Sequence, residues 1–248
     1  MAAAETLFIS DLHLSPERPA ITQLFLEFLR HRARAAQALY ILGDLFEYWL
    51  GDETTEHPAV RPIVAALHTL TSAGVPVGVL HGNRDFLLGA GFEGKTGCRV
   101  LADPTCIGLY GKPVLISHGD QLCIDDVDYM KLRAIVRNAA WQREFLAKPM
   151  AEREAMARGL RDYSKDATAQ KAAQIMDVNQ GAVEALMRAH AVYELIHGHT
   201  HRPGEHRFTL DGQSARRMVL GDWYEQGSVL AFTAEGWELE RLAVTRDL

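Results

Sequence analysis

Short apolar runs, each closed by glycine and polar residues, alternate with helical stretches and constrain this chain most strongly. Residues 6–10, 38–42 and 75–80 are such runs, and their length and flanking turn residues predict strands that are buried on both faces. Between them, residues 21–34 and 60–72 carry apolar side chains at helical spacing. The strand–helix–strand–helix–strand order predicts an α/β fold with helices packed on a sheet.

Further strands are predicted after this first block. Residues 106–110 and 112–117 are expected to form a hairpin, and Asp211-Gly212 and Glu235-Gly236 stand where two more hairpin turns would fall. The carboxyl-terminal third has four strand-like runs, at residues 192–196, 207–210, 217–220 and 228–232.

Residues 125–190 interrupt this pattern, because they are rich in Ala, Arg, Lys, Met and Gln and have almost no strand signal. We expect one domain over residues 1–248, with a helical insertion, or cap, over residues 125–190. From Lys131 to Lys171 there are ten basic and five acidic residues, although the whole chain has a net charge of −6. A basic helical segment on an acidic protein points to an anionic ligand or surface, while a solvated helix face explains the composition equally well.

The bulk composition excludes several classes of protein. The overall negative charge gives no general attraction to nucleic acid, and no protein partner is indicated. The three cysteines form no Cys-x-x-Cys pair, which is typical of reduced, mostly buried thiols in a cytosolic protein. No apolar run is long enough to span a membrane, and the first residues do not resemble a secretion signal.

Histidine, aspartate and asparagine follow five of the predicted strands. The loops after strand carboxyl ends are where α/β folds place their sites, so we expect these side chains to meet. Their nitrogen and oxygen donors suit Mn, Fe, Zn or Co, and they are too many for one tetrahedral ion, so two ions sharing a carboxylate fit better. A lone histidine or aspartate is more often a structural group, but five such motifs together favour metal binding. The candidates are Asp11, His13, Asp44, Asn83, His118, His199 and His201.

The motif order Asp-x-His, Gly-Asp, Gly-Asn, His and Gly-His-x-His resembles the calcineurin-like metallophosphoesterase superfamily. This resemblance implies a two-sheet α/β sandwich flanked by helices, with a two-metal site. It implies seven ligands: Asp11, His13 and His201 for one ion, Asn83, His118 and His199 for the other, and Asp44 as the bridge.

Longer segments resemble one family within that superfamily, which hydrolyses UDP-2,3-diacylglucosamine in lipid A biosynthesis. They are "FISDLHLSPERP", "LYILGDLFEYWLGDE", "LHGNRDFLLG", "LISHGDQLCIDDVDY" and "LIHGHTHRP", and the likeness runs from about Leu7 to Trp223. It implies hydrolysis of a phosphoric anhydride to UMP and 2,3-diacylglucosamine 1-phosphate (lipid X), by attack of hydroxide generated at two divalent ions, usually Mn²⁺. It also implies a cytoplasmic enzyme that is peripheral on the cytoplasmic face of the inner membrane.

The same resemblance implies which residues act on the substrate. Catalytic roles fall on Asn83, Arg84, His118 and His199. Thr168 occupies a contact position where the family leads us to expect asparagine. Substrate contacts are expected at Asn83, Arg84, Asp126, Ser164, Thr168, Lys171 and His199, with Tyr129 and Arg161 as additional candidates.

Arg84 helps to choose the reaction. Protein phosphatases of the superfamily have histidine at this position, where it can give a proton to an alkoxide. Arginine stays protonated and cannot act as a general acid, but it can hold a phosphate in a bidentate manner. A phosphate leaving group, with a second pKa of ~6, departs at neutral pH without a proton. Arg84 therefore favours cleavage of a diphosphate, although His118 or His199 could still supply a proton.

The insertion offers apolar residues for acyl chains, although such a stripe is usually the packing face of a helix. They are Tyr129, Met130, Leu132, Ile135, Val136, Trp141, Phe145, Met150, Met156 and Leu160. Basic helices that carry Trp141, Phe145 and Met150 could also rest on an anionic membrane surface. His81 and His197 are expected to support ligands rather than to bind metal, and Asp85 and Asp120 to hydrogen-bond ligating imidazoles.

Two other functions stay open at this stage. A generic two-metal phosphodiesterase or nuclease of the same fold would share every metal ligand, but it should lack the long helical insertion. A non-enzymatic scaffold would typically have lost several ligands, whereas all seven are present here.

Overall fold

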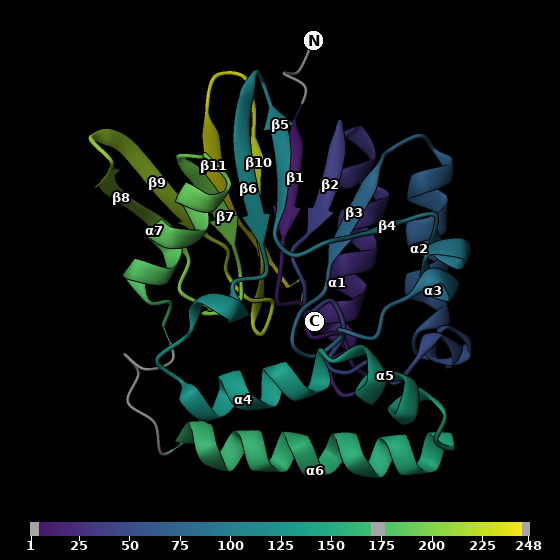
Figure 1. Cartoon of the computed structure of the whole chain (residues 1–248). Helices are drawn as coiled ribbons and strands as arrows, with labels where there is room; N and C mark the ends of the chain where they lie inside the picture. Colours follow the sequence, from purple (N-terminus) through teal and green to yellow (C-terminus); the bar gives the residue numbers. More distant parts are fainter. Residues whose placement is uncertain (1–4, 170–176, 245–248) are drawn as a thin grey trace.

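Two stacked β-sheets form the centre of the molecule, with helices on their outer faces (Figure 1). The computed structural model describes residues 5–169 and 177–244. The first sheet, in spatial order, contains β11 (Trp237–Ala243), β10 (Gln226–Phe232), β1 (Thr6–Ile9), β2 (Ala38–Ile41), β3 (Val77–Leu80) and β4 (Arg99–Leu101). The second contains β5 (Thr105–Leu109), β6 (Lys112–Ser117), β7 (Glu194–His197), β9 (Gln213–Val219) and β8 (Gly204–Leu210).

The direction of the strands decides where the loops meet. β1, β2, β3 and β4 pair in parallel in the first sheet, and β6, β7 and β9 pair in parallel in the second. The carboxyl ends of β1, β2, β3, β6 and β7 therefore lie at one end of the sandwich (Figure 1). In this view three helices lie across that end: α4 (Val127–Val136), α5 (Ala139–Leu146) and α6 (Met150–Ala169). We call these three helices the cap.

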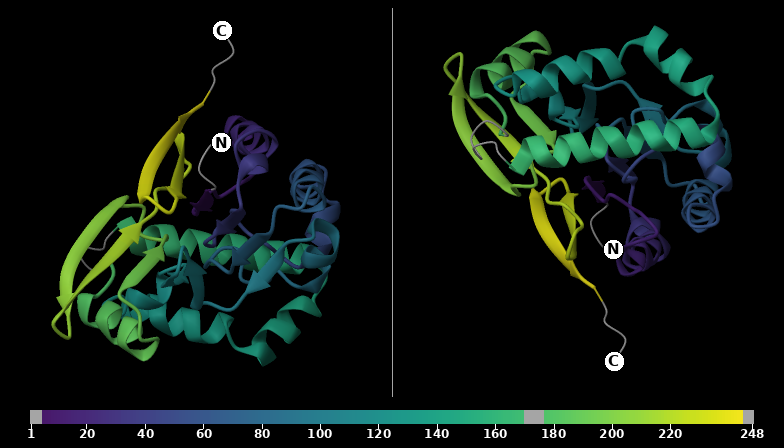
Figure 2. Two further views of the ribbon diagram at one scale, coloured as in Figure 1. Left: turned by 90° about the horizontal axis from the view of Figure 1, so that it is seen from above. Right: turned by 90° about the horizontal axis from the view of Figure 1, so that it is seen from below.

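The remaining helices cover the outer faces of the two sheets. α1 (Pro19–Arg30), α2 (Arg61–Ser72) and α3 (Ala90–Thr96) lie on the first sheet, and α7 (Gln180–Ala189) lies on the second (Figure 2). Short 3-10 turns occur at η1 (Ala33–Ala35), η2 (Asp52–Glu56) and η3 (Asp120–Leu122).

The alternation of side chains along β1 builds two layers of core at once. Leu7 and Ile9 pack against the helices of the first sheet, whereas Phe8 points between the sheets, as the two-residue period of a strand requires. Phe8 stacks on Tyr40 with ring centroids 5.2 Å apart, and it packs in the same layer as Ile116 and Ile196. Both faces of β1 are thus buried away from water, which explains its unbroken apolar sequence.

The predicted α/β fold with two sheets is confirmed, with differences at particular elements. The first helix ends at Arg30 rather than near residue 34, because residues 33–35 form η1. β4 was not predicted, and for β11 only the preceding turn at Glu235-Gly236 was predicted; both strands lie at the edges of the first sheet. In β11 the charged residues Glu238, Glu240 and Arg241 stand among half-buried apolar ones, so its signal is weaker than that of a buried strand.

α7 falls within the predicted insertion but packs on the second sheet. Its buried residues Val183 and Met187 join Leu115 of β6 and Leu195 of β7 in one apolar cluster. Because β6 and β7 are parallel neighbours, the chain needs a crossover between them, and α7 is the helix of that crossover. The boundaries of the insertion at residues 125–190 stay a prediction.

Candidate metal centre and substrate cavity

The seven predicted ligands come together at the carboxyl ends of the strands. The loops after β1 and β2 run side by side, because Asp11 donates its N–H to the Gly43 carbonyl (3.1 Å) and His13 donates to the Asp44 carbonyl (2.9 Å). The loop after β7 joins them, since His199 donates its backbone N–H to the Asp11 carboxylate (2.9 Å). These bonds hold side chains from both sheets at one point.

Asp11, His13 and His201 form the first group. His201 Nε2 lies 3.3 Å from Asp11 Oδ1, and the rings of His13 and His201 meet edge to face at 5.4 Å. One donor atom of each of the three residues lies within 4.8 Å of the others. Asp44 adjoins this group, with Oδ2 3.7 Å from His13 Nε2.

Asn83, His118 and His199 form the second group. Asn83 Oδ1 lies 3.1 Å from His118 Nε2 and 3.0 Å from His199 Nδ1. Asp44 Oδ2 is 3.9 Å from His118 Nε2, so this oxygen lies between the two groups. His118 Nδ1 donates to the Leu42 carbonyl (2.8 Å), which leaves Nε2 free to act as a ligand.

The backbone of the centre is strained. Asp11, His13, Asp44, His199 and His201 all have φ between 48° and 69°. Residues other than glycine rarely adopt this left-handed backbone region, and each residue that does so costs about 1–3 kcal/mol of conformational free energy. The loop–loop hydrogen bonds are what hold these conformations, and the clustering of strain marks a functional site.

Glycines let the loops approach one another at the centre. A Cβ on Gly82 would overlap the carboxylate and backbone nitrogen of Asp44. A Cβ on Gly198 would overlap the Asp11 carboxylate, and one on Gly43 would lie 2.6 Å from His118 Nδ1. These glycines are therefore required by the closeness of the ligand side chains.

The donor set fits divalent cations. Asp11 Oδ1 and both ring nitrogens of His13 are buried without a hydrogen-bond partner, although Glu47 Oε2 lies 3.3 Å from His13 Nδ1. Buried polar atoms without a hydrogen-bond partner are energetically costly unless they coordinate an ion. Nitrogen and oxygen ligands without thiolate suit Mn, Fe, Zn or Co.

The electrostatics of the centre also favour positive charge. Burial disfavours charged His118, but the surrounding carboxylates, led by Asp44 and Asp11, outweigh burial and raise its pKa to about 9. Burial likewise opposes ionisation of Asp11, yet the hydrogen bond and charge of His201, with His118 and His13, hold its pKa below the usual range. A site whose field retains a proton on a buried imidazole also attracts a metal cation.

Two aspartates have roles that differ from the predicted ones. Asp85 was expected to bond an imidazole, but its buried carboxylate accepts backbone N–H groups from Leu45 (2.7 Å), Gly82 (2.9 Å), Asp44 and Phe46. It ties the loop after β2 to the loop after β3. Burial, and then the charge of Asp44, raises the pKa of Asp85. No imidazole is hydrogen-bonded to Asp85 in the part of the chain described.

Asp120 bonds the cap instead of an imidazole. It accepts from the Tyr129 hydroxyl (2.6 Å) and from Arg133 Nε (2.8 Å). Burial opposes its ionisation, but His118 and Arg133 outweigh that effect and hold the pKa of Asp120 low. Among the described residues, Asp120 interacts with His118 and His199 through their charges and not through a hydrogen bond.

His197 lies outside the metal groups. It is fully buried, with Nδ1 2.8 Å from the Gly198 carbonyl, and its Nε2 accepts from Arg217 (3.1 Å). Burial and the charge of Arg217 lower the pKa of His197 to about 3, so the ring is neutral at physiological pH. His81 makes one such contact too, with Nε2 2.7 Å from the Leu88 carbonyl.

A cavity of about 410 Å³ opens beside the metal centre, between the strand-end loops and the cap. Asn83 and Arg84 line it and so join it to the metal centre, and the backbone N–H of Arg84 donates to Asp44 Oδ1 (2.8 Å). Its apolar lining includes Trp49, Leu50, Phe86, Leu87, Leu132, Val136, Trp141, Phe145 and Ala157. The cavity thus combines an apolar lining, drawn from the cap and the core loops, with polar residues that join it to the metal centre, a combination that suits a ligand with both apolar and anionic parts.

One face of α4 brings further cations to this cavity. Tyr129, Arg133 and Arg137 follow at intervals of four residues and all line it, because residues four apart share a helix face. Tyr129 also packs on His199, with ring centroids 5.8 Å apart. Tyr129 is among the substrate contacts predicted from the sequence, whereas Arg133 and Arg137 are not, although their four-residue spacing is visible in the sequence.

Several predicted contacts differ from expectation or lie outside the described structure. Ile135 and Met156 are exposed, whereas Met150 lines a different cavity. Asp126 caps the amino end of α4 by accepting from the Tyr129 N–H (3.0 Å). The side chains of Leu160, Arg161, Ser164 and Thr168, and the whole of Lys171, are outside the described residues.

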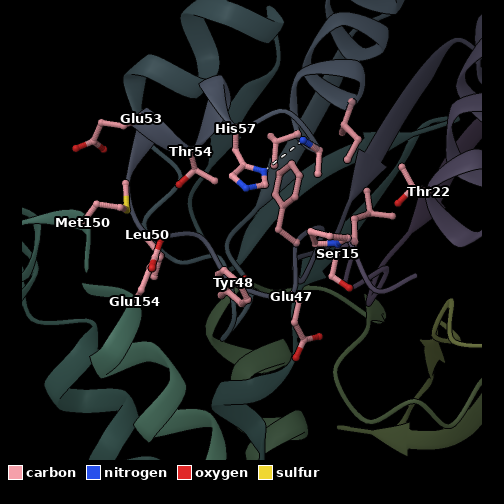
Figure 3. A pocket seen from close by; sticks show the side chains of 16 residues that line it. Ser15, Thr22, Glu47, Tyr48, Leu50, Glu53, Thr54, His57, Met150 and Glu154 are labelled. Carbon is pink, nitrogen blue, oxygen red and sulfur yellow. Dashed lines mark hydrogen bonds between the residues drawn. The ribbon is translucent and has the colours of Figure 1, made fainter. Parts of the chain in front are cut away.

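A second cavity, of about 230 Å³, lies behind the loop after β2 (Figure 3). Met150 and Glu154 of the cap reach it from one side, and Thr22 of α1 lies on another (Figure 3). It shares four lining residues with the larger cavity: Glu47, Tyr48, Leu50 and Glu154. These residues form the wall between the two cavities.

Comparisons with known proteins agree with this site. The chain belongs to the family described as calcineurin-like phosphoesterase, whose profile matches residues 5–203. A dimetal phosphatase from Danio rerio has a TM-score of 0.52 at 12% identity, over 99% of this chain and 98% of its own, which shows a shared fold.

Within that class the chain belongs to the UDP-2,3-diacylglucosamine hydrolases. It is 50% identical to the enzyme of that name from Stenotrophomonas maltophilia (strain K279a), over 96% of this chain and 98% of the relative. Identity to the enzyme from Xanthomonas campestris pv. campestris is 48%, over 96% and 99%.

Gly82→Ala tests the packing of the metal centre. The new Cβ would overlap Asp44, so we expect lost metal and a fall in activity of about 100-fold, as small displacements of catalytic groups cause. Elemental analysis after dialysis against Mn²⁺ measures the first effect. Gly94→Ala is the matched control, because nothing lies within 4 Å of its Cβ position; equal metal content in both variants would contradict the packing argument.

Proposed function

We propose that the chain hydrolyses the diphosphate bond of UDP-2,3-diacylglucosamine, releasing UMP and 2,3-diacylglucosamine 1-phosphate. One observation carries this proposal: two neighbouring groups of candidate metal ligands adjoin a cavity with an apolar lining, and Asn83 and Arg84 belong to that lining. A diacylated sugar diphosphate has the matching shape, since it joins charged phosphates to apolar chains. The relatives named for this activity support the choice of substrate.

The proposed ligand roles follow the two groups. Asp11, His13 and His201 would hold one divalent ion, and Asn83, His118 and His199 the other, with Asp44 between them. Mn²⁺ is the proposed ion, because the family that the sequence resembles usually uses it and the nitrogen and oxygen donors present, without thiolate, are compatible with it. When bound, two such ions polarise phosphoryl oxygens and lower the pKa of water so that it can attack phosphorus.

The chain's own residues would position the substrate and stabilise charge. Arg84 follows Asn83 in the lining of the cavity, where its guanidinium would bind the diphosphate and stay protonated throughout. Arg133 and Arg137 add positive charge along the same wall. Asp126, Tyr129, Arg161, Ser164, Thr168 and Lys171 complete the proposed set of substrate contacts.

The cavity excludes water from the acyl chains by its apolar lining. Leu132, Val136, Trp141 and Phe145 of the cap and Phe86 of the core all line it. Trp141 packs on both Phe86 and Phe145, with centroids 6.3 Å and 5.1 Å apart. A nuclease or a general phosphodiesterase has no use for such a lining, which favours the lipid substrate over these alternatives.

The direct test is incubation of purified protein with Mn²⁺ and UDP-2,3-diacylglucosamine in oxygen-18 water. We expect UMP to form, with the label in UMP because attack falls on the phosphorus next to uridine. Mass spectrometry of both products measures the outcome. Absence of UMP from protein that has bound metal would refute the substrate, and label in the sugar phosphate would refute the point of attack.

Arg84→Ala separates substrate binding from metal binding. The guanidinium belongs to neither metal group, so we expect the metal content to be unchanged while kcat/KM falls by about 10²–10³-fold, as when a charge-stabilising donor is removed. Elemental analysis and steady-state kinetics measure the two quantities. Loss of metal in this variant would contradict the assigned role.

We also propose that the enzyme is peripheral on an anionic membrane, at the cytoplasmic face of the inner membrane. In the described residues no helix is long and apolar enough to cross a bilayer. Trp141 and Phe145, first expected to touch lipid, instead pack inside the cavity. The other face of α4 is exposed and carries Val127, Lys131 and Ile135, four residues apart, and such an apolar and basic face suits a lipid surface.

Val127→Asp tests this surface. An added negative charge on an anionic membrane costs ~1 kcal/mol, so the partition coefficient should fall about fivefold. Co-sedimentation with phosphatidylglycerol vesicles measures it. Ala243→Asp is the control, because it adds the same charge at an exposed residue of β11 that is far from the cap in sequence. If both variants bind alike, α4 is not the contact face.

A further inference from the structure

Arg153 is a buried cation at the start of α6. Only 4% of the residue is exposed. Its Nε donates to the Lys148 carbonyl within the cap (3.0 Å). Its two other nitrogens cross to the core, where they donate to the Leu50 carbonyl and to Glu53 Oε1 (2.7 Å). One side chain thus ties the cap to the loop after β2.

The core loop is shaped to receive this guanidinium. Gly51 has φ 131°, and a Cβ there would lie 2.5 Å from both Arg153 Nη1 and Glu53 Oε2. Any larger residue would be strained and would also displace the ion pair. The Arg153 hydrogen bond lowers the pKa of Glu53, so the pair is charged at physiological pH.

The same loop is bonded to the segment that carries Arg84. Trp49 donates its backbone N–H to the Arg84 carbonyl (3.2 Å). Asp52 accepts from the Trp49 indole (3.1 Å) and from the N–H groups of Gly89 (3.1 Å) and Gly91 (2.7 Å). A short path of hydrogen bonds therefore connects the cap to the segment after β3.

The position of this connection matters for the substrate. Figure 3 shows Leu50 and Glu53 beside Met150 and Glu154, where the start of α6 approaches the core. Leu50 and Glu154 belong to the wall shared by both cavities. A shift of α6 would move that wall relative to Arg84.

Stability alone is a weak explanation for a buried arginine. Desolvation of the guanidinium offsets much of its attraction to Glu53, whose side chain is 59% exposed. An apolar residue would cover the loop at lower cost. The geometry is better explained by orientation, because three acceptors fix the guanidinium from three directions.

We propose that Arg153, with Gly51 and Glu53, is a latch that sets the position of the cap relative to Arg84, and so determines productive binding of the diacylated substrate. Arg153 is a positioning residue, since it does not line the substrate cavity. This inference rests on the proposed function, because it concerns the acyl-bearing substrate of the same site.

Arg153→Met is the main test, with two substrates compared. KM for UDP-2,3-diacylglucosamine should rise by about tenfold, while kcat/KM for bis-p-nitrophenyl phosphate, which needs only the metal centre, should change less than about twofold. Metal content should stay at the wild-type value. Arg143→Met, an exposed arginine of α5, is the matched control and should change neither substrate.

Two further variants keep the test decisive. Arg153→Lys retains the charge but cannot reach three acceptors, so its KM should lie between wild type and Arg153→Met. Glu53→Gln removes only the exposed partner of Arg153 and should also raise KM. It replaces Arg153→Met as the test if that variant fails to fold. Amide hydrogen exchange should be faster in residues 150–159 of each latch variant and unchanged in α7.

The possible outcomes separate the latch from the proposed function. If wild type fails to hydrolyse the diacylated substrate, the proposed function is wrong. If wild type hydrolyses it and Arg153→Met has unchanged KM, the latch alone is wrong. A parallel loss of both substrates would assign Arg153 a structural role and would also overturn the proposal.

Discussion

The rest of the structure depends on one constraint: the loops must hold many charged and polar side chains closer together than those side chains would lie without the surrounding hydrogen bonds. Asp11 and Asp44 are both buried, and each lies near His118 and His13. Without a cation such carboxylates repel, and five ligand residues add backbone strain. Asp85 counters part of this cost, since its carboxylate fixes four backbone N–H groups of two loops. Cations would offset the remainder, so metal binding and the order of these loops are physically linked.

The cap is joined to this centre by three arginines that act alike. Arg133 bonds Asp120, in the loop after β6, and Arg137 donates to the Gly82 carbonyl (2.9 Å), in the loop after β3. Arg153 donates to the Leu50 carbonyl, in the loop after β2. Each therefore ends on a loop that also carries a metal-site residue. The cap is oriented by the same backbone segments that orient the ligands, which couples recognition of the substrate to the geometry of the reaction.

The fold and the metal centre could largely be predicted from sequence, because their signals are local. A buried strand followed by Gly-Asp or Asp-x-His is visible within ten residues, and parallel strands bring such loops to one end. Asp85 was misjudged because most of its partners lie on the loop after β2, up to 41 residues away. Asp120 was misjudged because its partners lie on α4 of the cap, whose placement over the loop after β6 is a tertiary contact. Arg153 gave no signal, since it stands between Glu152 and Glu154 and looks like any solvated helical cation. Its burial depends on a contact 103 residues away.

The two faces of α4 show how one short helix can serve two environments. Tyr129, Arg133 and Arg137 face the cavity, whereas Val127 and Ile135 are exposed to solvent. Apolar residues are therefore only weakly segregated to one side of α4, because each of its two faces carries both cations and apolar groups. Such a helix would be unremarkable as a packing element, yet its two faces match the two proposed contacts: substrate phosphates on one side and a lipid surface on the other. Under the proposed membrane contact, a substrate would pass from membrane to metal centre around the edge of a single helix, and its acyl chains would stay out of bulk water.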